Sequence, residues 1–80
     1  MKNNYTVFGK PIELTDLEVK IVEWIKAQLA DGIDQIFGED IEYGTGIDNK
    51  VARGALSSLV KKGAIDVNTE DGGLISLFVD

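Results

Sequence analysis

Apolar residues recur at three- and four-residue intervals in two long stretches of the chain, and this spacing predicts two amphipathic helices. In the first stretch the recurring positions are Leu17, Ile21, Val22, Ile25 and Leu29. We expect a helix over residues 16–30 with this stripe in the core and Trp24 beside it. Thr15 and Glu18 have the spacing of a capping box, in which each side chain binds the other residue's backbone N–H. The helix should therefore begin after Thr15 and end at Asp31-Gly32.

The second helical stretch covers residues 49–62. Its apolar positions, all expected on one buried face, are Val51, Ala52, Ala55, Leu56, Leu59 and Val60. Asp48 precedes the stretch as an N-cap, because its carboxylate can accept hydrogen bonds from the free N–H groups of the first turn. Gly63 follows the stretch and suits a left-handed C-terminal cap.

Between these helices the apolar pattern is shorter. Residues 33–37 contain three apolar positions, and we interpret them as a brief strand or an extended connector. Gly38 should then open a short helix over residues 39–43 with Ile41 facing inward. Gly44-Thr45-Gly46 predicts a tight corner between helices, since two glycines tolerate positive φ.

Alternating and β-branched positions predict strands at both ends of the chain. Residues 5–8 favour a short edge strand, broken by Gly9-Lys10-Pro11. Ile65 and Val67 begin a second strand, and residues 69–73 form the tip of a hairpin that returns over residues 74–79. On the return strand Ile75, Leu77 and Val79 should share one face.

Composition adds bounds to this pattern. Eighty residues, 44% of them hydrophobic and 28% charged, fit one small globular domain. The chain contains no cysteine and no histidine, so disulfides, thiolate chemistry and the usual general base are excluded. No apolar run approaches the length of a membrane span, and we expect a cytoplasmic protein. The formal net charge of −6 argues against binding of nucleic acid by the whole surface.

One segment opposes this acidic balance. Residues 49–62 contain Lys50, Arg53, Lys61 and Lys62 and no acid, so their charge is +4. Two interpretations remain open. The lysines at the end of the helix can simply complement its dipole, or the outer face of the helix can bind an anionic partner.

The sequence supports an enzyme less well than a binding protein. Gly44-Thr45-Gly46 begins like a dinucleotide fingerprint, but Asn49 occupies the position of the third glycine. Glu39, Asp40 and Glu42 could pair for acid–base work, although successive helical positions point them outward to solvent. Ser57 and Ser58 have no histidine to activate them. We therefore expect no enzyme, no cofactor and no metal site.

The order of elements, and the sequence of the segment FGEDIEYGTGIDNKVARGALSSLVKKGAIDV, resemble the winged helix-turn-helix superfamily, as in MarR-like and response-regulator DNA-binding domains. The residues that carry the resemblance are Ala52, Leu56, Leu59 and Gly63, spaced as in a recognition helix. The resemblance implies an α+β fold of three helices with a small antiparallel β-wing. It covers residues 14–80, and residues 1–13 are expected to form an N-terminal arm or edge strand of the same domain.

The resemblance also implies a small transcription regulator that binds double-stranded DNA. Its recognition helix, residues 49–62, would place Asn49, Lys50, Arg53 and Ser57 in the major groove. Lys61 and Lys62 would contact phosphate.

Several features depart from that pattern. The expected wing tip carries Glu70 and Asp71 where DNA-binding wings usually carry arginine or lysine, and the short second helix is acidic. An alternative is a protein-interaction module whose acidic surface binds a basic protein partner or mimics nucleic acid. In either case we expect the first helix, near Trp24, or the N-terminal strand to support a homodimer.

Overall fold

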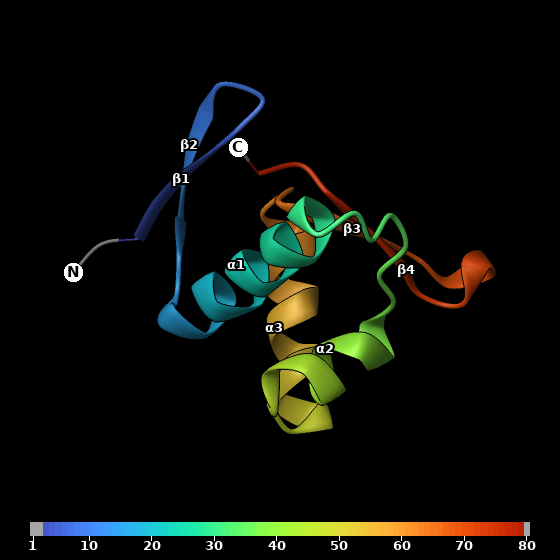
Figure 1. The fold of residues 1–80 in the computed structure, drawn as a ribbon. Coiled ribbons are helices and arrows are strands. Elements are labelled where there is room, and N and C mark those ends of the chain that lie inside the picture. Colours follow the sequence, from blue (N-terminus) through green and yellow to red (C-terminus); the bar gives the residue numbers. More distant parts are fainter. Residues whose placement is uncertain (1–2, 80) are drawn as a thin grey trace.

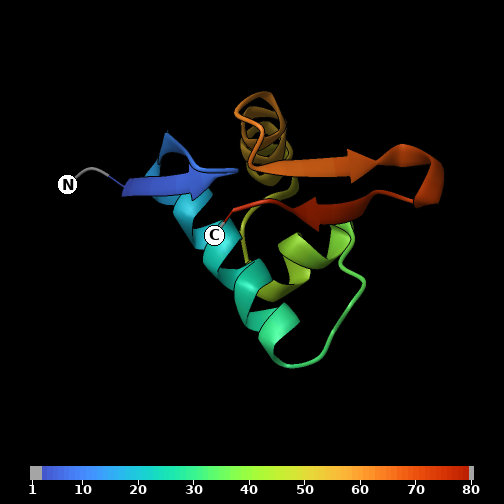
Figure 2. The same ribbon diagram turned by 90° about the horizontal axis from the view of Figure 1, so that it is seen from above.

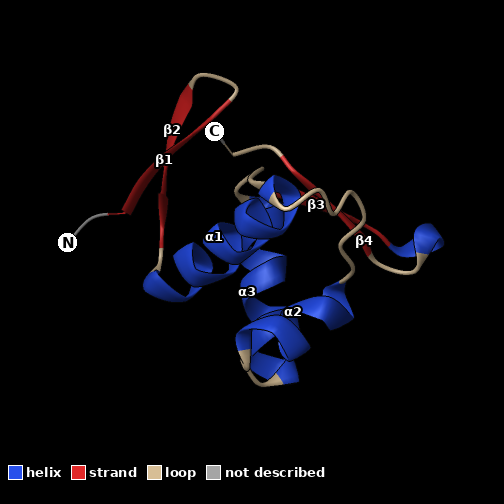
Figure 3. Cartoon of the chain, viewed as in Figure 1, coloured by secondary structure: helices blue, strands red, loops and turns tan. Residues whose placement is uncertain are grey.

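The computed structural model describes residues 3–79, and these form an α+β fold of three helices and two small antiparallel sheets (Figure 1, Figure 3). In chain order the elements are β1 (Asn3–Val7), β2 (Lys10–Leu14), α1 (Asp16–Ala30), α2 (Gly38–Thr45), α3 (Asn49–Lys61), β3 (Ile65–Asn68), a 3₁₀ turn (Thr69–Asp71) and β4 (Leu74–Leu77). In Figure 2 the N-terminal hairpin lies at the left of the view and the turn of the C-terminal hairpin at the right.

Helix α1 has the predicted bounds, and its capping box is confirmed. The Thr15 hydroxyl accepts from the Glu18 N–H, while Glu18 Oε1 accepts from the Thr15 N–H at 2.8 Å. The buried stripe is confirmed at Ile21, Val22 and Ile25. The prediction for Leu29 is wrong: this residue is 43% exposed, in the last turn of the helix, which ends one residue later.

The N-terminal residues form a hairpin, which corrects the prediction of a lone edge strand over residues 5–8. Strand β1 pairs with β2 from Asn3↔Leu14 to Val7↔Lys10, so Pro11 belongs to a strand. Phe8 and Gly9 form the two-residue turn, with φ of 49° and 80°. Such turns need positive φ at both central residues and usually contain asparagine or glycine, which is why the sequence pattern did not reveal this one.

The middle of the chain is a connector followed by α2. Residues 33–36 belong to no helix or strand, and the Ile75 N–H donates to the Ile36 carbonyl at 2.7 Å, so the connector is held against β4. Helix α2 is longer than predicted and includes Gly44 and Thr45. The predicted corner is therefore Gly46 alone, with φ of 74°.

Gly44 has a different role from the one predicted. Its φ is not positive, and a Cβ at this position would overlap the ring of Trp24 on α1. The ring is half-buried against this glycine. Trp24 is consequently covered by α2, which removes one reason for expecting a homodimer at this position; the homodimer itself stays a prediction.

Helix α3 begins after its predicted N-cap, Asp48, and ends before Gly63, which has the predicted left-handed conformation. Its buried residues are Ala52, Ala55, Leu56 and Leu59. Val51 and Val60 were predicted on the same face but are 48% and 40% exposed. They flank the buried stripe on opposite sides of the helix.

The C-terminal hairpin pairs β3 with β4 from Ile65↔Leu77 to Asn68↔Leu74. Ile75 and Val79 are buried and Leu77 is partly buried, in agreement with the prediction that these three residues share one face. The return strand is shorter than predicted because β4 ends at Leu77; Val79 instead makes an isolated bridge to Val7 of β1. A second bridge joins Phe37 to Leu74. The C-terminal hairpin therefore contacts the end of the connector through Leu74, and Val79 beyond the hairpin contacts the N-terminal hairpin through Val7.

Buried side chains from every helix and every strand meet in one cluster, centred on Ile21, Ile25, Ile41, Leu59 and Ile65. Within residues 3–79 none of the helices has the length and apolar character needed to cross a membrane.

Candidate nucleic-acid interface

The outward side of α3 carries the predicted site residues. Asn49, Lys50, Arg53, Ser57 and Lys61 are all exposed. By the 3.6-residue period Lys50, Ser57 and Lys61 lie opposite Ala52, Ala55 and Leu59, while Asn49 and Arg53 lie nearer the edge of the buried face. The helix is held in place at its start, where the Asp48 carboxylate accepts from the Lys50 N–H at 3.2 Å. We call Lys50, Gly54, Ser57 and Lys61, which follow one another at four- and three-residue spacing, the outer ridge of α3.

The cations of this surface are available for a ligand. The two ion pairs found in residues 3–79 are Lys26–Glu23 and Lys62–Glu18, so Lys50, Arg53 and Lys61 take part in none. Arg53 and Asn49 lie at one edge of the ridge and line a groove that α3 shares with α2 and the β3–β4 turn.

Gly54 lies in the middle of the outer ridge, and the sequence pattern predicts no role for it. Its φ is not in the left-handed region, and a Cβ there would meet nothing within 4 Å. Glycine in a helix interior costs about 1 kcal/mol relative to alanine. Neither backbone conformation nor packing inside the chain requires a glycine here, so its absent side chain leaves room for something outside the chain.

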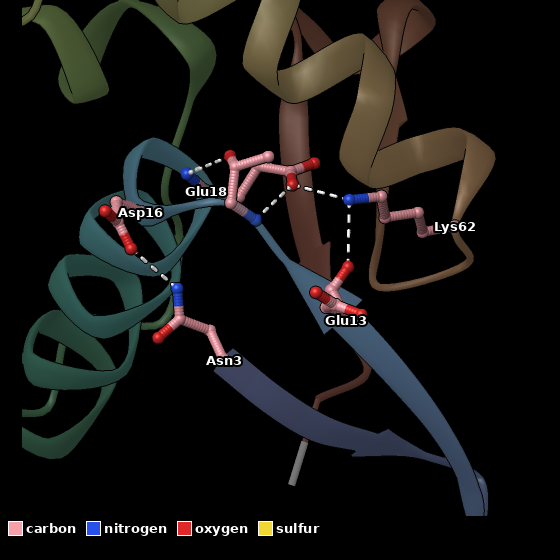
Figure 4. A network of polar contacts seen from close by, with 6 residues as sticks. Asn3, Glu13, Asp16, Glu18 and Lys62 are labelled. Atoms are coloured by element: carbon pink, nitrogen blue, oxygen red, sulfur yellow. Dashed lines mark hydrogen bonds and ion pairs between the residues drawn. The ribbon is translucent and has the colours of Figure 1, made fainter. Parts of the chain in front are cut away.

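Lys62 does not join the other predicted site residues. Its Nζ lies 2.6 Å from Glu18 Oε1 and 3.0 Å from the Glu13 carbonyl oxygen, and Figure 4 shows the side chain turned from the end of α3 toward β2 and the start of α1. The structure thus assigns this lysine to a contact between elements. The predicted set is reduced to five residues that share one exposed side of α3.

The contact with Lys62 matters because its partner, Glu18, is a buried carboxylate. Its side chain is almost fully buried, Oε1 accepts from Lys62 and from the Thr15 N–H, and Oε2 has no hydrogen-bond partner among the described residues. Burial alone raises the pKa of this carboxyl group, but the hydrogen bonds from Lys62 and Thr15 outweigh burial, and the pKa lies below its ordinary value. Glu18 is therefore a buried carboxylate that stays ionised.

Acidic groups surround the basic side of α3. Glu39 and Glu42 of α2 line the same groove as Arg53. The C-terminal hairpin, residues 65–77, contains Asp66, Glu70 and Asp71 and no basic residue. The basic surface is consequently limited to α3 and does not continue onto the hairpin.

The sequence matches no protein-family model, and neither the curated proteins nor the solved structures searched contain a match to the chain or its fold. The function of the chain is therefore inferred from the geometry of α3 and its surroundings.

Proposed function

We propose that this chain has a winged-helix fold and binds double-stranded DNA with α3. Three features support the fold: α2 and α3 meet at the single left-handed residue Gly46, α3 exposes one side, and a two-stranded hairpin lies beside it. The hydrogen bond from the Ile75 N–H to the Ile36 carbonyl and the isolated Phe37↔Leu74 bridge lie where the winged-helix arrangement has a short strand between its first two helices, and this position also supports the proposal.

The observation that carries the functional proposal is the outer side of α3. Lys50, Arg53 and Lys61 are exposed and free of intramolecular ion pairs within residues 3–79, and Gly54 leaves space between them. A phosphate backbone needs cations of this kind, and arginine offers two donors to guanine in the major groove. A backbone or base edge can approach the helix closely at Gly54.

The acids beside α3 limit how DNA can lie. Glu70 and Asp71 at the hairpin tip would face phosphate with like charge if the hairpin followed the DNA backbone. Contact is therefore expected through the ridge and Arg53 alone, which predicts modest affinity with a strong dependence on salt.

A salt titration with a random-sequence DNA duplex, followed by fluorescence anisotropy, tests the proposal. Lys61→Ala should weaken binding to all sequences alike and reduce the slope of log affinity against log salt by about 1, since one phosphate contact is lost. Arg53→Ala should cost about 1–3 kcal/mol on a selected site and relax discrimination at one base pair. Glu70→Lys with Asp71→Lys should tighten non-specific binding.

Lys20→Ala is the matched control, because Lys20 is an exposed lysine on α1, away from the proposed interface. It should leave affinity and salt slope unchanged. Absence of duplex binding at low salt, by both the parent chain and the double-lysine variant, would contradict the proposal.

A further inference from the structure

A groove of about 830 Å³ lies between α2, α3 and the β3–β4 turn. These three elements surround it: α2 contributes residues from Gly38 to Tyr43, α3 contributes positions from Asn49 to Val60, and the hairpin contributes Val67, Thr69, Gly72 and Gly73. The hydrogen bond from the Gly38 N–H to the Gly73 carbonyl, at 3.2 Å, joins α2 to the hairpin at one end of the groove.

The floor of the groove is apolar and incompletely covered. Ala52, Leu56, Val60 and Val67 line it; Ala52 and Leu56 are buried, whereas Val67 is half-buried and Val60 is 40% exposed. Tyr43 lines it from α2 with 86% of its surface exposed. Apolar surface of this kind gains about 25 cal/mol for each Å² removed from water, so a ligand that covers it would be stabilised.

Acidic groups border this floor on two sides. Glu39 and Glu42, three residues apart on α2, are both exposed lining residues. Glu70 and Asp71 lie between the lining residues Thr69 and Gly72 of the hairpin turn. Neither ion pair of the described residues involves these four carboxylates, and Arg53 is the single basic side chain that the lining contributes within residues 3–79.

We propose that this groove binds a short cationic segment of another protein. Apolar side chains of the segment would rest on Tyr43, Val60 and Val67, and its lysine or arginine side chains would reach the carboxylates of Glu39 and Glu42. DNA does not fit this description, because phosphate would face the carboxylates and gain nothing from the apolar floor. A second copy of the chain fits poorly, since its net charge of −6 would oppose the carboxylates of the groove.

The test uses the capped peptide KKLLKK, titrated into the isotope-labelled chain in the absence of DNA and followed by amide chemical shifts. The peptide should shift resonances of the groove, such as those of Glu39, Val60 and Gly73. The peptide KKSSKK, which keeps the charge, and the peptide EELLEE, which keeps the apolar side chains, should each bind at least about tenfold more weakly.

Variants of the chain separate the groove from its overall acidity. Glu39→Lys with Glu42→Lys should weaken KKLLKK binding by about tenfold or more, whereas Asp34→Lys with Asp66→Lys, which makes the same change in net charge outside the groove, should change it by less than about threefold. Val60→Lys changes an exposed residue of the groove floor. It tests KKLLKK binding independently if the variant with Glu39→Lys and Glu42→Lys does not fold. Equal weakening in the charge-matched control, equal binding of KKSSKK, or shifts that map elsewhere would each overturn the proposal. Because no DNA is present, these outcomes are separate from those of the DNA titration.

Discussion

At the scale of single residues, the Glu18–Lys62 pair shows that one tertiary contact can change the role inferred for a charged side chain. A lysine in the last turn of a basic helix complements the helix dipole and is a natural candidate for phosphate. Its true partners, the Glu18 carboxylate and the Glu13 carbonyl, are far away in sequence. A contact between a helix end and the start of another helix depends on tertiary packing, which residue spacing along one helix does not reveal.

Lys62→Met tests this role. The substitution keeps most of the aliphatic stem but leaves the buried Glu18 carboxylate without its cation, so at neutral pH we expect a loss of about 2–4 kcal/mol in the free energy of unfolding. Urea denaturation measures it. Lys61→Met is the matched control: Lys61 is the adjacent, exposed lysine without an ion pair among the described residues, and the substitution should change stability little.

The pH dependence of the same variant gives a second readout. Because the folded-state pKa of Glu18 lies below its unfolded value, the parent chain has the full contribution above the ordinary carboxyl range and loses it as the pH falls toward the lowered pKa. A protonated Glu18 no longer needs the ammonium group. The stability gap between parent and Lys62→Met should therefore narrow as the pH falls from neutral through the ordinary carboxyl range toward the lowered pKa of Glu18. A gap independent of pH would show that Lys62 acts through its stem alone.

At the scale of elements, the ends of α1 and the start of α3 were predictable, whereas the end of α2 and the edges of the buried helix faces were not. Local chemistry sets the ends: the Thr15–Glu18 box, Asp48 and Gly63 lie where the sequence pattern predicts them. The β1–β2 hairpin was missed because Phe8 adopts positive φ in a turn that usually takes asparagine or glycine. Val51 and Val60 were assigned to the core because periodicity gives the direction of an apolar face but not the width that neighbouring elements cover.

The same limit applies to the candidate site. Asn49, Lys50, Arg53, Ser57 and Lys61 could be placed on one exposed side of a helix from their spacing alone. The groove could not, because its walls come from α2, α3 and the hairpin turn, and their arrangement depends on contacts between elements. Gly54 was overlooked because an exposed helical glycine has no periodic signature.

The two helical glycines provide a paired prediction. Gly54→Ala should raise the free energy of unfolding by about 0.5–1 kcal/mol, since alanine favours the helix and meets nothing. Gly44→Ala should instead lower it by about 1–3 kcal/mol, because the new methyl group overlaps the Trp24 ring. Chemical denaturation of both variants measures the contrast, and a stabilising effect at Gly44 would show that the ring does not lie against α2.

At the scale of the whole molecule, one buried cluster connects all the elements, so loss of one core side chain should affect the entire fold. Leu56→Ala should cost about 2–5 kcal/mol by removing apolar contact and leaving a cavity. Val60→Ala, one turn further along α3 at an exposed position, should cost less than about 1 kcal/mol. Equal melting temperatures of the two variants would place Leu56 outside the core.

The Val7↔Val79 bridge has a consequence for the time course of folding. Hairpin β1–β2 contains only local pairings and can close within microseconds, yet the backbone that meets Val7 lies at the other end of the described residues. A nascent chain leaving the ribosome would expose the Val7 edge until Val79 has been synthesised. Docking of the first hairpin is thus a late, high-contact-order event, and the hydrogen-exchange protection of β1 should appear together with that of β4.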